Sequence, residues 1–130
     1  MATDGLTLEN SPFVAPEQRE WAEAAERGVL FIKRCRNCGK PHYYPRFYCP
    51  FCQSAETEFV KASGKGEIYT FTICRVPATP IINAYVTLAE GPTIMTRIVD
   101  AHPEDVAIGQ TVSLVFEPSS MGFPVPCFRP

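Results

Sequence analysis

The residues best suited to chemistry are four cysteines that form two C-x-x-C pairs separated by ten residues: Cys35, Cys38, Cys49 and Cys52. In each pair a tight turn can bring both sulfurs to one ion; Gly39 stands where such a turn needs a positive φ, and Pro50 stiffens the second turn. Four thiolates with no position left for water describe a closed structural site, typically tetrahedral zinc. We therefore predict one Zn²⁺ per chain, with iron as the less favoured occupant. Two disulfides are the alternative, disfavoured because the chain starts with no secretory signal and cytosolic thiols stay reduced.

The segment between the two pairs is rich in aromatic and basic residues. The rings could form a miniature core for a small ribbon, or an exposed docking surface, and both can hold because so short a segment cannot bury four rings. Arg46 could bond carbonyls of the turns or a CoA phosphate. His42 is expected at the surface or beside the metal ligands, because four cysteines already fill the site. The candidate contacts to a partner or ligand are Lys40, Tyr44, Arg46, Phe47 and Phe51.

No catalytic constellation is readable in the rest of the chain. The sequence has no G-x-S-x-G, Walker or G-x-G-x-x-G motif, and it has only two histidines. Cys74 and Cys127 lie in apolar, strand-like runs and are expected to be inert buried thiols. We therefore predict a protein without catalytic residues of its own, not an enzyme.

The net charge of −2 hides a segregation of charge along the chain. Residues 1–28 carry six acids and two bases, residues 29–55 carry five bases and no acid, and residues 56–130 carry eight acids and five bases. The metal segment is thus the one basic patch of an acidic protein, suited to a phosphate-bearing ligand, an acidic partner or its own acidic helix. No apolar run approaches the roughly twenty residues of a membrane span, so we expect a cytoplasmic protein without a membrane.

The elements that must position the cysteines follow from the surrounding pattern. Residues 17–27 predict a helix, with acids in its first turn, Gly28 at the C′ position and Trp21 as its anchor to the rest of the chain. A strand at 29–32 leads into the first cysteine pair. After residue 56 alternating runs are broken by glycine and proline, and they predict five strands at 67–75, 82–89, 93–100, 111–117 and 124–129.

Five short strands within this length suit a closed Greek-key barrel, the OB-fold, with a small open β-sandwich as the alternative. We therefore predict a mostly β protein in which an N-terminal helix and a rubredoxin-like zinc ribbon precede a five-stranded OB-fold barrel. The expected division of the chain is an arm and helix at 1–28, the zinc ribbon at 29–55 and the OB-fold domain at 56–130.

The order of these motifs resembles the family known as domain of unknown function family 35. The likeness spans roughly residues 16–130. Its motif residues are Cys35, Cys38, Gly39, Pro45, Arg46, Cys49, Pro50 and Cys52 in the ribbon, then Gly64, Gly66, the run 69–72, Glu90, Gly91, Ile108, Gly109 and Val112. This resemblance implies a rubredoxin-like zinc ribbon fused to an acyl-CoA-associated OB-fold, and it carries only the four metal ligands onto this chain.

The resemblance further implies an accessory role beside thiolase-superfamily enzymes (thiolases, aldolases or acyltransferases) that act on CoA thioesters in lipid metabolism. The alternative is a module for single-stranded nucleic acid, disfavoured because the barrel region is acidic where a phosphate-tracking groove should be basic. A rubredoxin-like electron carrier, which needs iron in the same four sulfurs, ranks third.

Overall fold

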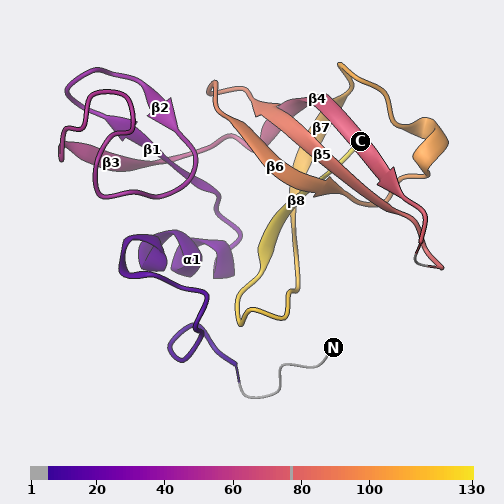
Figure 1. Ribbon diagram of the computed structural model, residues 1–130, viewed down its shortest axis with the longest axis horizontal. Coiled ribbons are helices and arrows are strands. Elements are labelled where there is room, and N and C mark those ends of the chain that lie inside the picture. Colours follow the sequence, from indigo (N-terminus) through magenta and orange to yellow (C-terminus); the bar gives the residue numbers. More distant parts are fainter. Residues whose placement is uncertain (1–5, 77) are drawn as a thin grey trace.

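The computed structural model describes residues 6–76 and 78–130. A three-stranded antiparallel sheet lies at one end of the molecule and a closed five-stranded barrel at the other, with an α-helix beside the sheet (Figure 1). The connection between the last two strands of the chain reaches toward the helix, and the last strand then runs away from it into the barrel. The mostly β class with one N-terminal helix is therefore confirmed.

The N-terminal helix begins with a 3-10 turn, η1 (Pro16–Gln18), and continues as α1 (Arg19–Glu26). Its end has the hydrogen bonds of a Schellman motif: Gly28 N donates to Ala25 O over 3.0 Å and Val29 N donates to Ala24 O over 2.9 Å. Gly28 has φ +77°, which a residue with a side chain rarely adopts, so its predicted place at C′ is confirmed.

The ribbon sheet has the order β2-β1-β3, formed by β1 (Phe31–Cys35), β2 (Pro41–His42) and β3 (Thr57–Lys61). The strand expected at 29–32 was placed two residues too early, because the register with β3 pairs Phe31 with Lys61 and Cys35 with Thr57. The division of the chain at residue 55 stays a prediction, but β3 follows that point and belongs to the same sheet as β1.

The barrel closes in the order β4-β5-β6-β8-β7, with β4 paired to both β5 and β7. This is the five-stranded OB-fold that the turn spacing predicts, and closure excludes the open sandwich. Strands β6 and β8 are parallel neighbours and share the pair Ile98–Phe128. The strands are β4 (Lys65–Cys74), β5 (Ile81–Leu88), β6 (Thr93–Ile98), β7 (Thr111–Glu117) and β8 (Val125–Arg129), with the 3-10 turn η2 (Pro103–Asp105) between β6 and β7.

Two buried clusters hold these parts together. The larger one fills the barrel and includes Leu30, Ile32 and Ala62 from the ribbon side. The smaller one centres on Trp21, which makes edge contacts with the Tyr43 ring at 6.2 Å and the Phe123 ring at 6.0 Å between centroids. Trp21 therefore anchors the helix to the ribbon loop and to the β7–β8 connection, as the sequence predicts.

Candidate metal centre and its surroundings

The four predicted ligands converge on one point at the far end of the ribbon. All four sulfurs lie within 4.8 Å of one another, and the Cys35–Cys52 and Cys38–Cys49 pairs have Sγ–Sγ distances of 3.6 Å. A tetrahedron with Zn–S bonds of 2.3 Å has edges of about 3.8 Å, so the donor set fits one tetrahedral ion. These distances are too long for disulfides, and all six cysteines are free.

The two knuckles have the same backbone construction. Gly39 N donates to Cys35 O over 2.9 Å, and Gln53 N donates to Cys49 O over 2.8 Å. Each of these two turns ends in a residue with a left-handed backbone conformation, Gly39 with φ +78° and Gln53 with φ +65°. The glycine was identifiable from the sequence, whereas Gln53 gave no signal because a non-glycine residue rarely adopts this conformation.

Hydrogen bonds support negative charge on the sulfurs. The backbone amides of Asn37 and Cys38 donate to Cys35 Sγ over 3.3 and 3.4 Å, and that of Phe51 donates to Cys49 Sγ over 3.4 Å. The Asn37 side-chain amide donates to Cys52 Sγ, and this bond, followed by a hydrogen bond from the Ser54 backbone, lowers the pKa of the Cys52 thiol to about 6. Cys38 shifts the other way: a hydrogen bond from the Lys40 backbone is outweighed by desolvation and the neighbouring thiols, which raise its pKa to about 11, so the cluster shares its protons until a cation replaces them. A thiol that is readily deprotonated is a better metal ligand, because metals bind the thiolate.

His42 is not part of the sulfur cluster, and of the two positions expected for it, at the surface or beside the metal ligands, the surface position is wrong. Its side chain is buried at 7% exposure, and both ring nitrogens lack a hydrogen-bond partner among the described residues. Burial, followed by the charges of Lys33 and Arg46, lowers the pKa of His42 below its usual value. The side chain is therefore neutral at neutral pH and forms part of the ribbon's interior.

The candidate contact residues are all exposed on the outside of the ribbon. Tyr44, Phe47 and Phe51 are 51–57% exposed, so they do not form the miniature core, and the Lys40 ammonium lies 5.3 Å from the Phe51 ring centroid. Tyr48, which was not singled out from the sequence, is also exposed. The ribbon's interior is supplied instead by α1 and by residues such as Pro45. A contact role for these rings stays a prediction.

The basic character of the ribbon is only partly neutralised. Arg36 lies 3.9 Å from Glu56 and 4.0 Å from Glu58, both exposed. Within residues 6–76 and 78–130, Lys40 and Arg46 make no ion pair closer than 4.0 Å. These two cations therefore remain available to an acidic group from outside.

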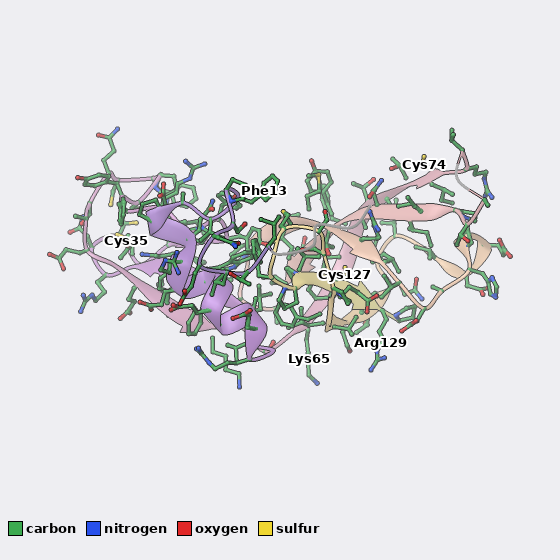
Figure 2. All side chains as sticks on the ribbon, turned by 90° about the horizontal axis from the view of Figure 1, so that it is seen from below. Phe13, Cys35, Lys65, Cys74, Cys127 and Arg129 are labelled. Atoms are coloured by element: carbon green, nitrogen blue, oxygen red, sulfur yellow. The ribbon has the colours of Figure 1, made fainter. Side chains whose placement is uncertain are left out.

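The two remaining cysteines differ from each other. Cys127 is buried, as expected, and burial raises the pKa of its thiol. Cys74 is exposed, which corrects the expectation that it is buried. Figure 2 shows Cys35 and Cys74 at opposite ends of the molecule with Cys127 between them. In the part of the chain that the structure describes, no helix is long and apolar enough to span a membrane.

The fold and the four-cysteine site together define a zinc-ribbon and OB-fold protein. Residues 22–58 match the family description "ChsH2, rubredoxin-like zinc ribbon domain", and residues 59–117 match "ChsH2, C-terminal OB-fold domain". A DUF35 domain-containing scaffold protein of Methanocaldococcus jannaschii is 40% identical over 105 residues, which cover 75% of this chain and 74% of the relative. The chain belongs to the DUF35 family.

Two further comparisons concern assemblies. A solved structure described as "Ltp2-ChsH2(DUF35) aldolase" superimposes with a TM-score of 0.79 at 30% identity, covering 92% of this chain and 98% of that chain. The benzoylsuccinyl-CoA thiolase subunit BbsA of Geobacter metallireducens is 32% identical over 77 residues, or 55% of this chain and 52% of the relative. Each is a protein to which this chain is similar.

Proposed function

We propose that this chain is a non-catalytic accessory subunit that binds or presents acyl-CoA thioesters to a thiolase-superfamily enzyme. The observation that carries the proposal is the near-complete mutual coverage, 92% and 98%, with the DUF35 chain of the aldolase structure. The similarity to a thiolase subunit supports the same class of partner. The scaffold description of the archaeal relative supports a role without turnover of its own.

In this proposal the ribbon is a rigid docking element and zinc fixes its shape. The four thiolates leave no open coordination position, so the ion acts structurally. Exposed aromatic rings beside unpaired cations suit a partner surface, because large aromatics supply most of the binding energy at interfaces and charges steer the encounter. The residues proposed for this contact are Lys40, Tyr44, Arg46, Phe47 and Phe51.

The test is reconstitution with the cognate enzyme. The purified chain alone should show no thiolase, aldolase or acyltransferase turnover, and addition of the partner should give a stable complex by size-exclusion chromatography with full activity. Turnover by the chain alone would refute the accessory role. A partner that is fully active alone and does not bind the chain would refute the subunit role.

A further inference from the structure

A groove runs between the N-terminal segment, the ribbon loop and the barrel. Its volume is about 680 Å³, and the segments that form it are the arm with α1, the loop after β2, the outer face of β5 and β6, and the β7–β8 connection. In Figure 2, Phe13 lies over this junction, between the ribbon and the barrel. The volume is within the range of about 300–1,000 Å³ that is typical of small-molecule sites.

The walls of the groove are held in place by specific contacts. Ser11 Oγ donates to Met121 O, which ties the arm to the β7–β8 connection. A Cβ at Gly122, with φ +95°, would lie 2.9 Å from Thr7 O, so these two backbones approach as closely as a glycine allows. Thr96 Oγ1 donates to Pro126 O over 2.9 Å across the parallel strands. The groove is therefore already formed in the free chain.

The surface of the groove is mainly apolar and is left open to water. Trp21 and Phe123 contribute buried rings, whereas Phe13, Tyr44 and Met95 are exposed at 53%, 51% and 70%. Exposed apolar area that converges on a concavity marks a site where a ligand removes it from water. The groove therefore favours an occupant with a substantial apolar body.

The charges of the groove cancel. Among the residues that the structure describes, its lining contains one cation, Arg97, and one acid, Glu117, and both act on the buried Cys127 thiol with opposite signs. The groove itself thus has no net charge to attract an ion. Arg46 follows Tyr44 by two residues, so the loop that forms one wall also carries a cation outside the groove. This arrangement matches a molecule with a neutral apolar portion joined to an anionic portion.

We infer that this groove binds the apolar acyl portion of an acyl-CoA thioester, leaving the phosphate-bearing portion outside. The inference rests on the proposed function for the thioester class and adds the place where the acyl chain lies. It predicts that the dependence of binding affinity on the length of the acyl chain arises in the groove, rather than in the metal ribbon or in the remainder of the barrel.

Trp21 is the single tryptophan of the chain and lines the groove, so its fluorescence reports occupancy directly. The zinc-loaded full chain is titrated with CoA, butanoyl-CoA and octanoyl-CoA. Octanoyl-CoA should change the Trp21 emission and bind more tightly than CoA, by about fourfold for each methylene that becomes buried. Equal affinity for CoA and octanoyl-CoA would overturn the inference.

A matched pair of variants locates the site. Met95→Glu places a charge at the groove, and Ile108→Glu places one at a similarly exposed position outside it, with 70% and 68% exposure. Because both side chains are in solvent, neither change should alter the unfolding midpoint. Met95→Glu should weaken octanoyl-CoA at least tenfold and leave CoA unchanged, and Ile108→Glu should weaken neither. Equal effects of the two variants would place the acyl chain elsewhere.

Binding to the partner enzyme is measured separately with the same Met95→Glu protein. If the chain binds the partner enzyme but its affinity for acyl-CoA does not depend on acyl length, the groove is not the acyl site and the accessory role stands. If its affinity for acyl-CoA depends on acyl length but no complex with the partner forms, the accessory role is refuted instead.

Discussion

Lys33 and His42 lie directly opposite each other in the β1–β2 ladder, and both side chains are buried. The Lys33 ammonium donates to Thr57 Oγ1 over 3.2 Å and lies 4.4 Å from the Phe59 ring centroid. Burial lowers the pKa of Lys33, and the charge of Glu20 on α1 opposes this shift. The interior of the ribbon thus already holds one cation, which makes a second charge at His42 unfavourable.

This arrangement predicts that stability decreases with acidification. The folded-state pKa of His42 is lowered, so below about pH 6.5 the unfolded state takes up protons that the folded state does not. The contribution of His42 to the free energy of unfolding is therefore fully present above that pH, and it is lost as the pH falls toward the folded-state pKa of His42. Urea unfolding between pH 7.5 and 5.5 should show a smaller decrease in His42→Gln than in wild type.

The control for this experiment is His102→Gln, which changes the other histidine of the chain, an exposed one. It should retain the wild-type pH dependence. Subtracting the pH profile of each variant from that of wild type also removes the effect of metal loss at low pH, because all three proteins share it. Identical pH profiles for His42→Gln and wild type would contradict the prediction.

The metal centre should contain one zinc per chain, and Cys49→Ser should remove it. Cys49 is buried at 1% exposure, whereas Leu30 and Ile32 are held in the barrel core. Metal loss should therefore unfold the segment around the two knuckles, residues 35–53, and leave the start of the ribbon packed. Elemental analysis gives the stoichiometry, and hydrogen exchange reports the loss of protection in this segment. Cys74→Ser, outside the cluster, should retain both zinc and protection. A coloured, iron-containing protein would instead favour the electron carrier.

Trp21→Ala should lower the free energy of unfolding by about 3–5 kcal/mol, the usual cost of removing a buried large aromatic. The ring is 8% exposed and joins the helix to Tyr43 and Phe123. Denaturant unfolding followed by circular dichroism measures the change, because the variant lacks the fluorescent residue. Ile108→Ala, at an exposed position, should cost less than about 0.5 kcal/mol. A similar small cost for Trp21→Ala would show that the helix contributes little to stability.

Phe47→Ala should weaken binding to the thiolase-type partner by at least about tenfold while leaving stability nearly unchanged. The ring is 56% exposed, so little packing is lost in the free chain, whereas a central interface aromatic is costly to remove. Association should also slow as salt rises, through Lys40 and Arg46. Tyr69→Ala on the barrel, at 67% exposure, serves as the control. A loss of stability without a loss of affinity would mean that the ring only packs the ribbon.

Local patterns in the sequence were sufficient for the four-cysteine cluster and for most barrel strands. The C-x-x-C spacing alone brings two sulfurs together, and strand β7 has the bounds that alternation predicts. Strands β2 and β3 were missed because their existence depends on pairing with β1, which is distant in sequence. β2 has two residues and β3 is only half buried, so neither has a periodicity to detect. The burial of His42 likewise depends on neighbouring elements that no local pattern reveals.

The exposure of Cys74 has a specific geometric cause. By simple alternation Cys74 would point inward with Gly66 and Ile68, since even numbers of positions separate the three along β4 and such residues lie on the same face of a strand. A bulge between Ile68 and Thr70 inserts one residue and reverses this alternation. Beyond it Phe71 and Ile73 are the partly buried residues that pack on the core, and Cys74 faces solvent. A single-residue irregularity of this kind leaves no composition signal.

The shared core of ribbon and barrel limits how such a chain can be inherited. Leu30 and Ile32 precede the metal knuckles, and Ala62 follows β3, yet all three are buried in one cluster with Val86 and Phe128 of the barrel. Recombination that exchanged the ribbon between relatives would transfer one side of a close-packed interior without its complement. The two units are therefore expected to have descended as a pair, with substitutions on one side compensated on the other.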